Sequence, residues 1–134
     1  MDIHLAGSRP TRRAPSESFV GTVWQDPIIA CEAPARLASN CVSFEPGART
    51  NWHTHPLGQT LYVISGVGRV QTKGGPILEI RPGDVVWIPA GEKHWHGASP
   101  VNAMTHLSMQ EALNGSPVTW MEPVTDAEYS AKIG

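Results

Sequence analysis

The chain has 134 residues and a mass of 14.5 kDa, which is enough to bury a core in one domain spanning residues 1–134. Hydrophobic residues make up 40% and charged residues 16%, a composition that excludes an intrinsically disordered chain. A formal net charge of -2 and a pI near 6.3 exclude the basic surface that nucleic-acid binding needs, and no apolar run approaches the ~18 residues of a membrane span.

The N-terminal segment shows no export signal. Met1–Gly7 lacks the charged stretch and the following apolar stretch of a signal peptide, so we expect a cytoplasmic protein. In that compartment Cys31 and Cys41 should be reduced, mostly buried thiols. The basic cluster Arg9–Arg13 is short and interrupted, and a mobile N-terminal arm explains it better than a phosphate-binding surface.

Short runs rich in β-branched and aromatic residues alternate with Gly and Pro along the whole chain. In chain order, the predicted strands are Ser18–Trp24, Arg36–Phe44, Thr60–Ser65, Gly68–Lys73, Ile77–Ile80, Val85–Ile88 and Ala103–Gln110. Long helical periodicity is absent, and only Thr125–Glu128 resembles a capping box that opens a short C-terminal helix. Many short strands with frequent turns predict an all-β sandwich or a closed barrel.

Histidines recur in pairs between these strands. His53 and His55 lie two residues apart, so both side chains leave the same face of an extended chain. His94 and His96 form a second such pair, just after the turn Pro89–Gly91. Two hairpins that present these pairs to one barrel interior can bring several imidazoles together.

Gln59 has the same parity as the first histidine pair and adds an amide oxygen to it. Three imidazoles and one amide oxygen suit a divalent transition metal. Burying such groups without a metal would leave several of them unpaired. The spacing therefore predicts a metal site, whereas the isolated His4 is expected at the surface.

The period of two in a strand also predicts which other side chains face the metal. The predicted pocket wall is the strand face that carries Ala38, Asn40, Val42 and Phe44, and the predicted apolar floor consists of Leu61 and Val63. The polar groups that share the pocket are His96, His106 and Gln110. Either histidine can hold the tautomer of a neighbouring ring or contact the substrate directly, and we favour substrate contact because a spare imidazole in a pocket is otherwise costly. Trp52 and Trp95 have the opposite parity and should face away, and the tryptophans in general are expected in packing or subunit contacts.

Two spaced motifs resemble those of the cupin family. The first runs Gly47, five residues, His53-Thr54-His55, three residues, Gln59, six residues and Gly66, with Gln in the place usually held by Glu. The second runs Gly83, five residues, Pro89-Ala90-Gly91, two residues and His94, with Ala98 in the place of the usual Asn. Together the motifs cover residues 47–66 and 83–98. The resemblance implies a double-stranded β-helix, or jelly-roll barrel, with a short C-terminal helix.

The likeness extends beyond the motifs. The stretches 44–61, 81–87 and 91–98, with Met104–Leu107 and Gln110–Glu111, are similar to small bacterial manganese cupins with hydroxynitrile lyase activity. That similarity implies a set of metal ligands consisting of His53, His55, Gln59 and His94. It also implies substrate-side, catalytic roles for Thr50, His96, His106 and Gln110.

The same resemblance implies one divalent metal per chain, with manganese expected first and iron, nickel, cobalt or zinc as alternatives. The implied reaction is the reversible cleavage of a cyanohydrin to an aldehyde and HCN, with His96 or His106 as the base. A neutral Gln59 ligand would leave the ion its full charge and strengthen its Lewis acidity. A small-molecule substrate is the expected partner, without nucleic acid or membrane, and the family forms homodimers or homotetramers.

Two other functions fit the same site. One is a different metal-dependent cupin enzyme, such as an isomerase or a decarboxylase-associated enzyme in aromatic or uronate catabolism. The polar substrate of a sugar or uronate isomerase would need more hydroxyl and charged groups than the predicted pocket offers. The other is a non-enzymatic, metal-bound binder of a small molecule.

Overall fold

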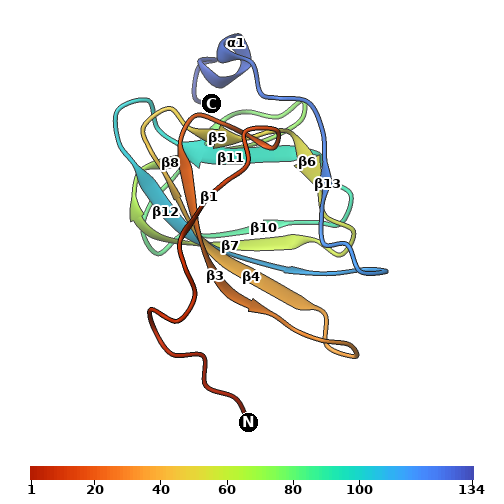
Figure 1. The fold of residues 1–134 in the computed structure, drawn as a ribbon. Coiled ribbons are helices and arrows are strands. Elements are labelled where there is room, and N and C mark those ends of the chain that lie inside the picture. Colours follow the sequence, from red (N-terminus) through yellow and green to blue (C-terminus); the bar gives the residue numbers. More distant parts are fainter.

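Two antiparallel sheets face each other and enclose the interior of the protein (Figure 1). The computed structural model describes all residues from 1 to 134. One sheet follows the order β1-β3-β4-β12-β7-β10 and lies below in Figure 1. Its strands are β1 (Arg12–Arg13), β3 (Val23–Ala30), β4 (Leu37–Phe44), β12 (Met104–Glu111), β7 (Gln59–Gly66) and β10 (Val85–Ile88).

The second sheet follows the order β13-β6-β11-β5-β2, and β8 also pairs with β11 and β9. Its strands are β13 (Thr119–Trp120), β6 (His53–Thr54), β11 (His94–Ala98), β5 (Arg49–Thr50), β2 (Phe19–Val20), β8 (Gly68–Thr72) and β9 (Leu78–Ile80). The arrangement of many short strands in two facing sheets confirms the predicted all-β barrel. No helix is long and apolar enough to cross a membrane.

Alternation along the strands sorts side chains between the interior and the outside of the barrel. In β12 the residues Met104, His106, Ser108 and Gln110 are buried, while the residues between them are only half-buried. This is the parity predicted from the sequence. At one end of the interior, Phe44, Val63 and Met104 belong to an apolar cluster of 11 buried residues. The polar inward-facing residues of the same strands lie outside this cluster and contribute to the site.

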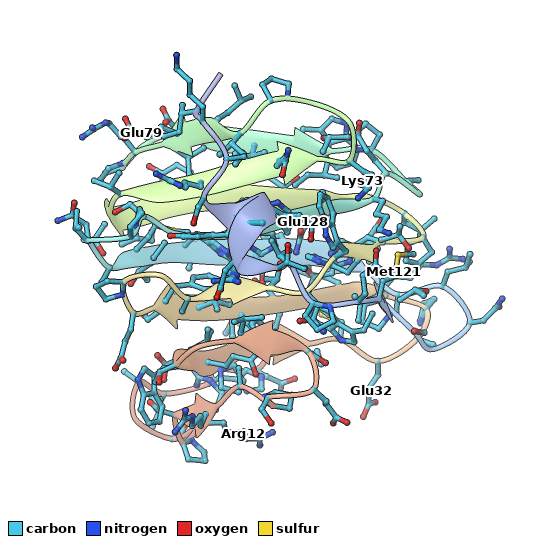
Figure 2. All side chains as sticks on the ribbon, turned by 90° about the horizontal axis from the view of Figure 1, so that it is seen from above. Arg12, Glu32, Lys73, Glu79, Met121 and Glu128 are labelled. Carbon is cyan, nitrogen blue, oxygen red and sulfur yellow. The ribbon has the colours of Figure 1, made fainter.

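A second, smaller core lies on the outside of the upper sheet, where the C-terminal segment packs. Trp52 and Trp95 are buried there against Tyr129, which confirms that both indoles face away from the interior. The helix α1 (Asp126–Tyr129) begins with the predicted capping box, in which Thr125 and Glu128 exchange hydrogen bonds. Viewed from above, α1 lies across this sheet, with Glu128 bonded to Lys73 (Figure 2).

Some expected elements differ from the structure. The single strand predicted at Ser18–Trp24 is two strands, because Gly21 adopts a positive φ of 82° and turns the chain between β2 and β3. β3 then continues past Pro27, which the sheet accommodates with a register shift between Pro27 and Ile29. Both cysteines are free thiols, as predicted, but they are half-buried rather than mostly buried.

Candidate metal centre

Three imidazoles and one carboxamide meet at the ends of three strands. His53 lies on β6 directly opposite His94 on β11, and their ring centroids are 4.2 Å apart. His55 follows β6, with its ring 5.0 Å from His53 and 5.5 Å from His94. Gln59 begins β7 and places its Oε1 atom 3.0 Å from Nε2 of His94. The four residues that the cupin resemblance implied as ligands therefore lie together.

Main-chain carbonyl groups set the tautomer of all three rings. Nδ1 of His53 lies 2.9 Å from the carbonyl oxygen of Asn51, and Nδ1 of His94 lies 2.8 Å from that of Glu92. Nδ1 of His55 lies 2.7 Å from the carbonyl oxygen of Pro117. Each carbonyl accepts a hydrogen bond from Nδ1–H, so each neutral ring presents an unprotonated Nε2 atom. Metal-binding histidines in proteins are oriented in the same way.

The amide of Gln59 is oriented by a chain of two further hydrogen bonds. Nε2 of Gln110 donates to the carbonyl oxygen of Ala38 at 2.8 Å, which turns Oε1 of Gln110 toward β7. Nε2 of Gln59 donates to this oxygen at 3.1 Å. Oε1 of Gln59 consequently points toward the imidazoles. Gln110, for which the resemblance implied contact with substrate, uses both polar atoms within the protein.

These donors fit a divalent cation. With Nδ1 protonated, Nε2 of His94 and Oε1 of Gln59 both present lone pairs to each other at 3.0 Å, a contact that requires a positive charge between them or on the ring. Nε2 of His55 is buried and has no hydrogen-bond partner in the protein. Such an orphaned acceptor is costly unless a cation binds it. One ring nitrogen each of His53, His94 and His96 also lie within 4.8 Å of one another, so a three-histidine group that could hold a metal is present.

A second imidazole pair lies beside this group. Nε2 of His106 is 2.8 Å from Nδ1 of His96, so the two rings share one proton. The outer nitrogens of the pair, Nε2 of His96 and Nδ1 of His106, are buried without a protein partner. Thr50 accepts a hydrogen bond from the backbone N–H of His96 at 3.2 Å and fixes the course of β11 at this point. A buried pair with one shared proton and two free nitrogens can take up and return a proton.

Burial keeps all five rings neutral near neutral pH. It lowers the pKa of His94 and of His106 to about 4. Burial, followed by the charge of neighbouring imidazoles, holds the pKa of His53 and of His96 well below 6.5. Burial also lowers the pKa of His55, partly offset by its bond to Pro117. Neutral imidazoles are the form that binds metals and accepts protons.

A cavity of about 230 Å³ opens in front of the histidines. Of the predicted pocket residues, Ala38, Asn40 and Val42 line it, whereas Phe44, Leu61 and Val63 do not. Phe44 belongs to the apolar cluster of the core instead. Both Leu61 and Val63 are fully buried, and the prediction of an apolar floor at these positions is wrong. Parity places them on the inner face of β7, but it cannot show that other side chains cover them.

Several residues of the cavity wall were not predicted as site residues. They are Phe19, Gln25, Ser108, Pro117, Val118 and Trp120. The indole of Trp120 lies 4.7 Å from the His53 ring and 5.3 Å from Phe19, so it forms part of the site and not only a packing contact. Ser108 has the same parity as His106 and Gln110 on β12, and this signal could have found it. Residues 117–120 carry no such signal, because they reach the site through the tertiary path of the chain.

The fold and the histidine group define the class of protein. The family model described as "Cupin domain" matches residues 40–106, and the chain belongs to the cupin family. A curated protein named (R)-mandelonitrile lyase, from Granulicella tundricola, is 56% identical over 129 residues, which cover 96% of this chain and 98% of that protein.

Solved structures agree with this assignment. A cupin-like protein from Thermotoga maritima superposes with a TM-score of 0.83 at 38% identity, covering 96% of this chain and 95% of that chain. A polyketide cyclase from Streptomyces resistomycificus superposes with a TM-score of 0.68 at 20% identity, covering 96% and 90%, which shows the fold alone. The fold, the three-histidine group and the lyase name of a close relative together support a cupin enzyme with a metal site.

Proposed function

We propose that the protein is a metal-dependent lyase that reversibly cleaves cyanohydrins to an aldehyde and HCN. The observation that carries the proposal is that the candidate ligands His53, His55, Gln59 and His94 lie beside a proton-sharing imidazole pair, His96 and His106, at one small cavity. The 56% identity to a protein named (R)-mandelonitrile lyase supports this reaction.

The proposed ligands are His53, His55, Gln59 and His94. Main-chain bonds at Nδ1 leave Nε2 of each of the three rings free to coordinate, and Oε1 of Gln59 lies 3.0 Å from Nε2 of His94. A divalent ion, when bound, supplies a Lewis acid that lowers the pKa of a nearby hydroxyl group. All four ligands are neutral, so nothing in this set offsets the charge of the ion. Manganese is the proposed metal, and iron, cobalt, nickel and zinc are the alternatives, because imidazole and amide oxygen bind each of them.

The proposed base is His96, whose ring centroid lies 5.2 Å from His53 and whose Nε2 is free. Nε2 takes the proton of the cyanohydrin hydroxyl as the C=O bond forms. The bond to the nitrile carbon breaks, and its electron pair leaves with cyanide, which takes the proton back and departs as HCN. His106 accepts a hydrogen bond from Nδ1 of His96 and stabilises the transient positive charge.

The cavity wall suits an aromatic aldehyde. Phe19, Val42 and Trp120 line the cavity with apolar surface, and no Lys, Arg, Asp or Glu is among its lining residues. An aryl group can pack against the two aromatic side chains. The polar atoms of the substrate would then face the imidazoles, which are the remaining titratable groups of the wall.

The test mixes metal-loaded protein with racemic mandelonitrile and follows the absorbance of benzaldehyde. We expect release well above the protein-free rate with at least one of manganese, iron, cobalt, nickel and zinc. His53→Ala should lose both bound metal and turnover. His106→Ala should keep its metal, measured by elemental analysis, and lose turnover, while the exposed His4→Ala should match the unaltered protein in both.

Two results would contradict the proposal. Absence of benzaldehyde release with every metal would remove the lyase reaction. Equal metal content in His53→Ala and the unaltered protein would remove His53 from the ligand set.

A further inference from the structure

Two side-chain amides in the cavity wall have no partner in the protein. Gln25 on β3 and Asn40 on β4 both line the cavity, and both are half-buried. Neither amide group makes a hydrogen bond to any other residue, whereas Gln59 and Gln110 in the same cavity are both bonded. Amide groups that face a cavity without partners are available to a ligand.

The register of the sheet places these amides away from the metal-binding group. Gln25 lies opposite Val42, and Asn40 lies opposite Ser108 on β12, which in turn pairs with β7. β4 is therefore two strands from β7, where Gln59 lies, which is roughly 10 Å at the usual strand spacing. β3 is one strand further. The two amides therefore lie on the side of the cavity away from Gln59, here called its far end, and Val42 lies between Gln25 and His106 in the register of the sheet.

The far end is polar but uncharged. Gln25 and Asn40 can each donate and accept a hydrogen bond, and no charged residue lines the cavity beside them. A carboxylate or an ammonium group would find no countercharge there. A methyl or ring C–H group would displace water from the amides without replacing its hydrogen bonds, which weakens binding. A neutral hydroxyl group meets both requirements.

We propose that Gln25 and Asn40 form a subsite for a ring hydroxyl, so that the preferred substrates are cyanohydrins of hydroxylated aromatic aldehydes. The preference among substrates rests on the proposed function, whereas the binding of a ring hydroxyl at this subsite does not. The aryl ring lies between Trp120 and Val42, and the hydroxyl group exchanges hydrogen bonds with the two amides. Sites that bond a substrate hydroxyl discriminate strongly against the analogue that lacks it.

The first experiment compares the cyanohydrins of 4-hydroxybenzaldehyde and 4-methylbenzaldehyde, with the 3-substituted pair in parallel. The ratio of their kcat/KM values in each variant is divided by the ratio in the unaltered protein, which cancels the different intrinsic reactivity of the two compounds. We expect this ratio to fall about tenfold or more in Asn40→Leu and in Gln25→Leu. The exposed Asn102→Leu is the matched control, since its side chain makes no bond and lies outside the cavity.

The second experiment measures binding of the two aldehydes themselves by ligand-observed NMR titration. Its result does not depend on whether the protein catalyses the reaction. We expect tighter binding of the hydroxylated aldehyde, and loss of that preference in both amide variants but not in Asn102→Leu. Circular dichroism shows whether each variant is folded, and the milder Asn40→Ala replaces any variant that is not. If the preference for the hydroxylated aldehyde in the Asn40 and Gln25 variants stays within about twofold of that in the unaltered protein, the subsite is overturned. If the protein cleaves mandelonitrile but shows no preference for hydroxylated compounds, the subsite is overturned and the lyase proposal stands. If it binds hydroxylated aldehydes selectively but cleaves no cyanohydrin, the lyase proposal is overturned and the subsite stands.

Discussion

Among the single side chains of the site, Gln110 has the most indirect connection to the proposed metal ligands. It contacts none of the three ligand imidazoles through a hydrogen bond, but it accepts one from Gln59 and donates one to Ala38. If Gln59 turned over, its NH₂ group would face Nε2 of His94 and the oxygen donor would be lost. Gln110 is thus a positioning residue for Gln59.

Replacing Gln110 with Leu should weaken manganese binding by roughly tenfold, because removing the outer partner of a metal ligand has effects of that size. The measurement is a titration with Mn²⁺ followed by electron paramagnetic resonance of the free ion. Met109→Leu is the control, since Met109 is the neighbouring residue on the opposite face of β12. Equal affinities in the two variants would show that Gln59 holds its orientation without Gln110.

At the scale of elements, the C-terminal segment is part of the site. β13 pairs with β6, so Trp120 lies opposite His53, and the carbonyl of Pro117 bonds the ring of His55. Further along, Tyr129 anchors the segment: its hydroxyl donates to the carbonyl of Ala98 at 2.6 Å. Loss of this anchor should loosen a segment that also orients a ligand.

Tyr129→Phe removes only this buried hydrogen bond, and we expect it to lower the free energy of unfolding by about 1 kcal/mol. Tyr129→Ala also removes the ring from its contacts with Trp95 and Arg49, and we expect a loss of about 3 kcal/mol or more. Urea denaturation of the metal-free protein measures both. Tyr62→Phe, at a half-exposed hydroxyl without a bond, should change stability by less than about 0.5 kcal/mol. A loss in Tyr129→Phe no larger than in Tyr62→Phe would contradict this role.

For the whole molecule, the five buried histidines make stability depend on pH. Burial holds their pKa values below the ordinary 6.5, down to about 4 for His94 and His106. Between these values the unfolded chain binds more protons than the folded one, so acid favours unfolding. Stability is full above about pH 7 and is lost progressively as the pH falls from 6.5 toward 4.

We expect the metal-free protein to lose roughly 1 kcal/mol for each strongly affected histidine between pH 7.5 and 5.5. Urea denaturation in the presence of a chelator at both pH values measures the loss. This pH range lies above the pH at which carboxyl groups ordinarily titrate, so the histidines dominate the change in stability. Saturating metal should raise stability at both pH values, because the folded rings are still largely neutral at pH 5.5. Equal stability of the metal-free protein at pH 7.5 and 5.5 would contradict the neutral, buried state of the rings.

Some residues of the site could be predicted from the sequence and others could not. The gathering of His53, His55, Gln59 and His94 could be predicted because the two histidine pairs follow a local period of two next to turns, which is a property of short segments. The choice of these four as ligands rests on the resemblance to the cupin motifs. Gln25 could not be found, because it lies beyond the predicted strand Ser18–Trp24, in a part of β3 that a proline interrupts.

By itself, the sequence determined the all-β class, the parity of each strand and the pairing of histidines, since all three depend on neighbours a few residues apart. The tertiary structure alone decided which side chains share a hydrogen bond across the barrel. The bonds from His55 to Pro117 and from His96 to His106 join different strands and loops, and their geometry depends on how the two sheets close on each other. It also decided that Leu61 and Val63 lie beneath the wall of the cavity, because burial depends on everything packed above a residue and not on its own position along a strand.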